Sequence, residues 1–187
     1  MNTSRWLPLL LVLACSDDAP APVSASASAP ADSREAELVA ATEGDPTYLR
    51  IDGDVLLYCD LRGGHTLELE EARVASLDEA CAPVDPNVAC AGLAVEAVVR
   101  SPGTGPDDVV DVAGKPYSMQ GKVRDCVSDG SRLAIATTSV VVLIDLEKQQ
   151  LMKLSRKDGG DRVAIGGDWV VWSSGSALHA RQVPASE

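Results

Sequence analysis

The sequence predicts an all-β domain with a short helical insert, preceded by an export signal and a linker. Apolar and polar residues alternate over short segments, Gly-containing turns separate those segments, and parts of the chain resemble one another. Hydrophobic residues make up 45% of the 187 residues, but Phe is absent and aromatic residues reach only 3%. We therefore expect a core of Val, Leu, Ala and Ile.

The net charge of -12 argues against nucleic acid as a partner. A polyanion is repelled by a negative field, and the chain holds no cluster of Lys and Arg interleaved with aromatic residues that could reverse that field locally. We therefore expect no nucleic-acid function.

Residues 1–14 have the features of a bacterial signal peptide. Arg5 supplies the positive charge, and an apolar run from Trp6 to Ala14 follows, interrupted only by Pro8. The run is about nine residues long, whereas a membrane-spanning helix needs about 20. We therefore expect this segment to direct export.

The run ends in Val12-Leu13-Ala14-Cys15, which resembles the lipobox of bacterial prolipoproteins, although Leu13 is bulkier than the usual residue there. The resemblance implies cleavage before Cys15 and its acylation, typically with palmitate, so that two or three acyl chains anchor the protein to a membrane. Ser16 resembles the second mature residue of lipoproteins sorted to the outer membrane in enteric bacteria. The expected location is the cell envelope, on either the periplasmic or the surface face. An ordinary secretory signal is the alternative.

Residues 15–44 are expected to tether the domain. Ser16–Asp32 is a low-complexity run of Ala, Ser and Pro that cannot bury a core. Its reach is roughly 20 Å as a coil and up to about 50 Å when extended. Ser33–Thr42 can form a short helix capped by Ser33 but is assigned to the linker. The domain is expected to span residues 45–187.

Strand and turn signals begin after Thr47. Tyr48–Ile51 and Asp54–Leu61 flank Asp52-Gly53, a dipeptide suited to a two-residue hairpin turn. A second turn is expected at Gly63-Gly64, and His65–Glu71 then alternates apolar and polar residues. These signals predict a three-stranded meander.

Two internal alignments predict a repeat. Val55–Leu69 aligns with Val140–Leu154 at an offset of about 85 residues, and Ser131–Ser139 aligns with Asp168–Ser176 at about 37. The two offsets suggest a unit of about 40 residues, with a degenerate copy between residues 90 and 125.

This recurrence of a strand, Asp-Leu, a turn and a second strand resembles the blades of bacterial β-propellers of the quinoprotein, TolB and WD types. It implies propeller-like blades of antiparallel strands. The chain holds about three units and a fraction, so we expect an incomplete or small propeller, with a small β-sandwich or barrel as alternatives. We expect the segment Trp169–Val183 to pair with Tyr48–Leu61, which places Tyr58 and Trp172 in neighbouring sheets, or two chains to complete each other.

The helical insert is expected at Ser76-Leu77-Asp78-Glu79, a capping-box pattern followed by Pro83. In the strand signal near the C-terminus, Trp169 and Trp172 stand at odd separation. Their side chains should therefore lie on opposite faces of a strand, one of them in the core.

Four cysteines follow Cys15, namely Cys59, Cys81, Cys90 and Cys126, and in an exported chain they predict two disulfides. The short proline-rich segment between Cys81 and Cys90 favours that pair, which leaves Cys59 with Cys126. Four reduced thiols are the alternative. We expect no zinc site, because no CxxC is present and neither His has ligand spacing.

The motifs GxSxG, HExxH and GxxxxGK[ST] are all missing from the sequence, and His65 and His179 are expected to be exposed strand residues. Asp107-Asp108 and Asp158-Gly159-Gly160-Asp161 contain the ligand types of calcium, but ordinary solvated turns explain them better.

The sequence therefore predicts a non-enzymatic, membrane-anchored binding module for a protein or cell-envelope partner, without a cofactor. One alternative is a small-ligand or calcium-dependent binding domain. Another is a glycoside hydrolase that depends on its carboxylates.

Overall fold

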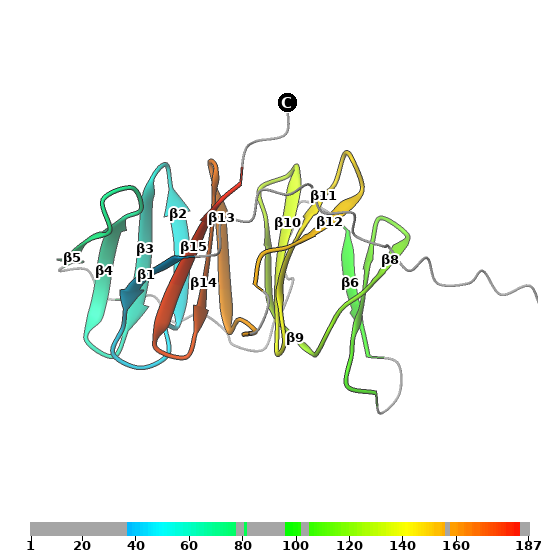
Figure 1. Cartoon of the computed structure of the whole chain (residues 1–187), viewed down its shortest axis with the longest axis horizontal. Helices are drawn as coiled ribbons and strands as arrows, with labels where there is room; N and C mark the ends of the chain where they lie inside the picture. Colours follow the sequence, from blue (N-terminus) through cyan, green and yellow to red (C-terminus); the bar gives the residue numbers. More distant parts are fainter. Residues whose placement is uncertain (1–36, 78–80, 82–95, 102–104, 156–157, 184–187) are drawn as a thin grey trace, which may run out of the picture.

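A computed structural model describes residues 37–77, 81, 96–101, 105–155 and 158–183 (Figure 1). Within these residues all regular structure is β, in four small antiparallel sheets, which confirms the all-β prediction. No helix long and apolar enough to cross a membrane occurs in this described part of the chain. The helical insert is wrong at Ser76 and Leu77, which belong to a strand. The rest of the predicted helix lies outside the described residues.

The sheets are numbered I to IV in the order in which strands β2 to β15 form them. The strand β1 belongs to sheet IV. Sheet I contains β2 (Tyr48–Asp52), β3 (Val55–Asp60), β4 (Gly63–Glu68) and β5 (Arg73–Leu77). Sheet II contains β6 (Ala97–Arg100), β7 (Val109–Val112) and β8 (Lys115–Ser118). Sheet III contains β9 (Val123–Ser128), β10 (Arg132–Thr137), β11 (Val141–Asp145) and β12 (Gln150–Lys153). Sheet IV contains β13 (Arg162–Gly166), β14 (Trp169–Ser174), β15 (Ala177–Gln182) and β1 (Glu37–Ala41).

The turns of sheet I follow the sequence signals with small shifts. Asp52 pairs with Val55, so Gly53, at a φ of 61°, forms the hairpin turn with Asp54. The positive φ explains the glycine. The second turn lies at residues 61–62, before the predicted one, because Gly63 and Gly64 already pair with Asp60 and Cys59 in the ladder.

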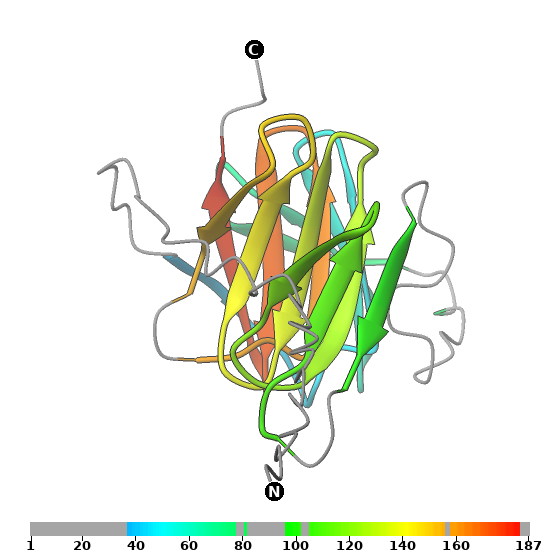
Figure 2. The ribbon, with the colours of Figure 1, turned by 90° about the vertical axis from the view of Figure 1, so that its right-hand side faces the viewer.

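The four sheets stack face to face in the order I, IV, III, II (Figures 1 and 2). A separate apolar cluster fills each gap: Leu56 and Leu67 meet Val171 between sheets I and IV. Ala134 packs with Trp172 between sheets IV and III, and Val110 packs with Ile135, Leu133 and their neighbours between sheets III and II. Because β-branched and small residues dominate, neighbouring sheets interlock with few aromatic rings, as the composition predicted.

Sheet IV is completed by the first strand of the described chain. Glu37 pairs with Ala180 and Ala41 with Ala177, and the amide of Thr42 donates to the carbonyl of Ser176 at 2.8 Å. The assignment of Ser33–Thr42 to a linker or helix is therefore wrong over β1. The physical reason is tertiary: β15 would otherwise be a bare edge, and pairing overrides the weak local preference of five residues.

The predicted pairing of Trp169–Val183 with Tyr48–Leu61 is also wrong, because β15 pairs with β1 and the two segments meet face to face. Tyr58 and Trp172 do lie in neighbouring sheets, I and IV, as predicted.

The alignment at about 37 residues is confirmed, since it superimposes β10 on β14, the second strands of sheets III and IV. The alignment at about 85 residues is shifted by one strand, because it matches the hairpin β3–β4 with β11–β12. Every hairpin repeats the strand-turn-strand pattern, so hairpins at different places in a sheet look alike. The degenerate copy is the three-stranded sheet II.

The disulfide joins Cys59 to Cys81, with the Cα atoms 5.9 Å apart, and Cys126 also forms a disulfide. Both predicted pairings are therefore wrong. The meander explains why: Cys59, Gly64 and Leu77 lie opposite one another on adjacent strands, so the chain returns to Cys59 just before residue 81. Closing this loop of 22 residues stabilises the fold by about 3 kcal/mol. Cys90 lies outside the described residues.

Candidate functional site

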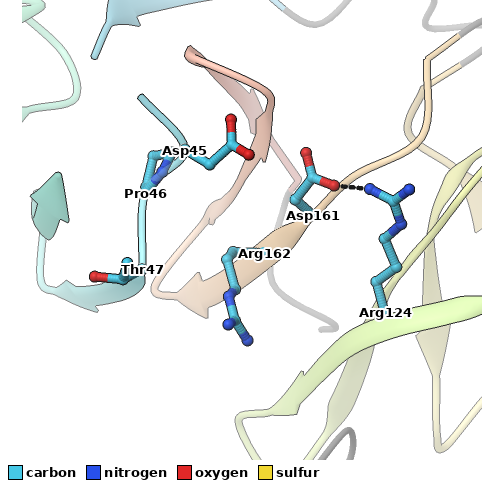
Figure 3. A pocket seen from close by; sticks show the side chains of 6 residues that line it. All are labelled: Asp45, Pro46, Thr47, Arg124, Asp161 and Arg162. Carbon is cyan, nitrogen blue, oxygen red and sulfur yellow. Dashed lines mark hydrogen bonds and ion pairs between the residues drawn. The ribbon is translucent and has the colours of Figure 1, made fainter. Parts of the chain in front are cut away.

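An open pocket of about 440 Å³ lies where three edge strands come together, namely β2 of sheet I, β9 of sheet III and β13 of sheet IV (Figure 3). We call it the axial pocket. Its lining consists of Asp45, Pro46, Thr47, Arg124, Asp161 and Arg162. Three sheets thus contribute side chains to one small surface.

The segments that build the pocket are held by backbone contacts. The amide of Thr47 donates to the carbonyl of Cys59 at 2.9 Å, which fixes the start of β2. Gly159 precedes β13, and a Cβ there would collide with the backbone of Thr137 and Thr138. The predicted loop at residues 158–161 therefore packs closely against the backbone of Thr137 and Thr138, and this contact positions Asp161 at the pocket.

Asp161 holds one of the two arginines. Its Oδ1 forms an ion pair with Arg124, and its Oδ2 accepts the amide of Gly175 at 2.8 Å. Arg162, unlike Arg124, forms no ion pair, because no carboxylate of the described residues lies within ion-pair distance of its guanidinium. Figure 3 shows its guanidinium directed away from Asp161, whereas the carboxylates of Asp45 and Asp161 face one another. Arg162 thus brings to the pocket a guanidinium that forms no ion pair with a described carboxylate.

Asp125, next to Arg124 on β9, ties the pocket walls together. Its Oδ2 accepts the amide of Val163 at 2.9 Å and its Oδ1 the amide of Cys126 at 3.0 Å. Burial raises the pKa of the Asp125 carboxyl above its usual value, although these amides and the nearby Arg162 act in the opposite direction. The bond to Val163 fixes sheet III against sheet IV.

The axial pocket has the chemistry of a binding site. Its lining contains two arginines and two aspartates, and its one side-chain hydroxyl belongs to Thr47. A guanidinium offers a planar set of donors for carboxylate or carbonyl oxygens, and the aspartates accept from cationic or amide groups. This arrangement suits a polar segment that carries both kinds of group.

The carboxylates of Asp107 and Asp108 bind the segment that connects sheets II and III. Asp108 is buried and accepts hydrogen bonds from Ser101 Oγ at 2.7 Å, Lys122 Nζ at 2.8 Å and the amide of Val123 at 2.9 Å. Asp107 accepts the amide of Gly121 at 2.8 Å. The pair therefore fixes the connection between sheets II and III. The described residues show no cluster of three or more His, Cys, Asp or Glu suited to a metal.

Replacing Asp108 by Asn is expected to lower stability at neutral pH by about 2 kcal/mol, the scale of hydrogen bonds to a charged group. Burial alone raises the pKa of Asp108, but the bonds from Lys122, Ser101 and Val123 outweigh it and lower that pKa. A depressed pKa stabilises the fold above the unfolded value of about 3.9 and loses that effect as the pH falls. Urea unfolding between pH 7 and pH 3 should thus show a smaller loss for Asp108→Asn than for wild type. An equal loss would contradict this role.

The tryptophan prediction is confirmed. Trp172 is 1% exposed and faces sheet III, whereas Trp169 is half-buried and packs toward sheet I. His179 was expected to be exposed, but it is half-buried with its ring 5.7 Å from that of Trp172. Burial lowers the pKa of His179, partly offset by Asp158. The expectation of an exposed His65 is wrong as well, since this residue is only 8% exposed.

Arg124 and Arg162 are not among the predicted site residues, although the repeat contains the signal. Arg124 and Asp161 are 37 residues apart, so extending the shorter alignment places Arg124-Asp125 on Asp161-Arg162. Opposite charges at equivalent positions of adjacent sheets predict an ion pair between them. Cys15 lies outside the described residues, and its lipidation stays a prediction.

Comparison with known proteins gives no sequence relative: no family model and no curated protein matches the chain. Among solved structures, it is similar to the computationally designed Ika8 protein, with 10% identity and a TM-score of 0.34 over 74% of this chain and 46% of that one. BamB from Moraxella catarrhalis matches with 14% identity and a TM-score of 0.33 over 78% and 45%. The extracellular domain of a one-component system from B. thetaiotaomicron matches with 8% identity and a TM-score of 0.32 over 76% and 21%. The chain thus spans less than half the length of these proteins.

Proposed function

We propose that this chain is a lipid-anchored binding module of the cell envelope, and that its axial pocket docks a charged segment of a protein partner. The guanidinium of Arg162 carries the proposal. It lines the pocket and forms no ion pair with a described carboxylate, so it can bind a carboxylate or carbonyl group of a partner. The facing carboxylates of Asp45 and Asp161 give the pocket a second, opposite specificity (Figure 3).

The anchor supports the same function. Acylated Cys15 and the Ala/Ser/Pro-rich segment up to Asp32 would hold the domain within tens of ångströms of a membrane. Confinement near one surface raises the effective concentration of a partner in the same membrane, so a modest pocket is sufficient for stable association. No enzymatic step is needed for this role.

The binding experiment uses the full-length lipidated protein in envelope membranes, with chemical cross-linking followed by mass spectrometry. Arg162→Glu is expected to reduce the captured partner at least about tenfold, because the reversal of charge turns attraction into repulsion. Lys148→Glu is the matched control, since it makes the same charge change in the exposed turn between β11 and β12. Equal capture by the two variants would refute docking at the axial pocket.

The anchor is tested separately. Cys15→Ser is expected to abolish fatty-acid labelling and to move the protein from the membrane fraction to the soluble fraction, or to leave it unprocessed. The measurement is fractionation with detergent partition. Normal cleavage with unchanged membrane partition in this variant would contradict the lipoprotein proposal.

A further inference from the structure

A second pocket, of about 480 Å³, lies in sheet I beside the end of β1, and its lining shares no residue with that of the axial pocket. We call it the rim pocket. Its lining includes Tyr58, Asp60, Arg62, His65, Ser76 and Leu77. Unlike the axial pocket, it brings a hydroxyl, an imidazole and a carboxylate to one surface.

The ladder places three of these side chains in one row. Tyr58 of β3 pairs with His65 of β4, and His65 pairs with Ser76 of β5. Directly opposite residues of antiparallel strands project from the same face. The ring of Tyr58 stacks on that of His65, with the centroids 5.0 Å apart. His65 is therefore held between an aromatic ring and a serine.

Asp60 fixes the other side of the imidazole. Nε2 of His65 lies 3.0 Å from Oδ1 of Asp60, whose side chain is 4% exposed. The same carboxylate accepts the amides of Glu43 at 3.0 Å and Arg62 at 2.8 Å. Burial raises the pKa of Asp60, but these hydrogen bonds outweigh it and lower that pKa. In the tautomer that donates its Nε2 proton to Asp60, His65 carries a lone pair on Nδ1.

Nδ1 of His65 is buried and has no hydrogen-bond partner. A buried polar atom without a partner costs roughly 1–3 kcal/mol, so a donor is expected nearby. Ser76 is opposite, with a Cβ–Cβ separation of about 5 Å for such a pair, and a rotation about its χ1 can bring the hydroxyl toward Nδ1. Ser76 is itself exposed, so the hydroxyl stays accessible from solvent.

We propose that the rim pocket is a hydrolytic site for short carboxylic esters, with Ser76 as nucleophile and His65 as general base. Asp60 is the positioning residue that fixes the tautomer of His65, as the logic of a nucleophile, a base and an orienting carboxylate requires. The guanidinium of Arg62 forms an ion pair with Glu43 through one nitrogen, and its remaining N–H groups are the donors for the oxyanion. The exposed side chains of Val74 and Leu77 receive the acyl chain.

The reaction proceeds in two balanced halves. Ser76 Oγ bonds to the acyl carbon while its proton passes to Nδ1 of His65, and the carbonyl π electrons move to oxygen. When the tetrahedral intermediate collapses, the ester C–O bond breaks and the leaving alcohol takes the proton from His65. Water then bonds to the acyl carbon and gives a proton to His65. The bond between the acyl carbon and Ser76 Oγ breaks, Oγ takes the proton from His65, and the acid is released.

The experiment treats the full chain with diisopropyl fluorophosphate and measures phosphorylation of each serine by peptide mass spectrometry. Ser76 is expected to react at least about a hundredfold faster than exposed Ser118, the scale of general-base catalysis. His65→Gln should remove this advantage, because the general base is lost. Hydrolysis of p-nitrophenyl acetate should follow the same pattern.

Ser76→Ala and Ser118→Ala form a matched pair of exposed strand residues, so both variants should fold and unfold in urea like wild type. Esterase activity should be lost in the first and kept in the second. A rate at Ser76 equal to that at Ser118 in the folded wild-type protein would overturn the proposal, as would esterase activity that survives Ser76→Ala. Neither result would affect docking at the axial pocket.

Discussion

A chain that lacks Glu37–Ala41 is expected to lose at least about 3 kcal/mol of stability and to associate through sheet IV. The deletion removes a five-residue strand and uncovers apolar surface that Val39 and Ala40 help to cover between sheets I and IV. It also leaves the free amides and carbonyls of β15 as an edge that can pair with another chain. Size-exclusion chromatography and urea unfolding measure the two effects.

The matched control deletes five residues of the predicted linker, Ser24–Ser28, and so shortens the chain equally. This control is expected to keep the elution volume and the urea midpoint of the wild-type protein. If the β1 deletion behaves like the linker deletion, β1 does not complete sheet IV in solution.

Trp172→Ala is expected to lower the free energy of unfolding by about 3–5 kcal/mol, the usual cost of truncating a buried Trp. Trp172 is 1% exposed and lies between sheets IV and III with Val163 and Leu143. A cavity there weakens the contact between the two central sheets of the stack. Trp169→Ala, in the same strand but half-buried on the opposite face, is expected to cost about 1–2 kcal/mol. Equal losses in urea unfolding would contradict the assignment of faces.

The hairpins of sheet I could be predicted because their signals are local. A glycine with positive φ and alternating apolar residues determine β2 and β3 within a dozen residues. The period of the repeat was also visible, since β10 and β14 occupy equivalent places in sheets III and IV.

The pairing of β1 with β15 could not be predicted in the same way, because Glu37 and Ala180 are brought together only by the complete stack. Five residues with a weak local preference carry no sign of a partner so far along the chain. The disulfide was missed for a related reason: separation along the sequence favoured Cys81 with Cys90, whereas the meander brings residue 81 back to Cys59.

The candidate sites could not be predicted from the sequence either, because their residues meet only in the folded structure. Asp60, His65 and Ser76 match no motif of fixed spacing, and only the register of β4 and β5 places the serine opposite the imidazole. The axial pocket likewise takes its side chains from three sheets. Only the ion pair between Arg124 and Asp161 could be predicted, because the repeat places opposite charges at these equivalent positions.

The order of strands along the chain has a consequence for biogenesis. A polypeptide is synthesised from its N-terminus, so β1 is made before any strand it can pair with. Its partner β15 is the last strand of the described chain, and contacts between such distant segments form slowly. Sheet IV can therefore be completed only after β15 has been synthesised. A product that terminates before β15 leaves both β1 and β14 with an unpaired edge, which makes incomplete chains prone to aggregation and proteolysis.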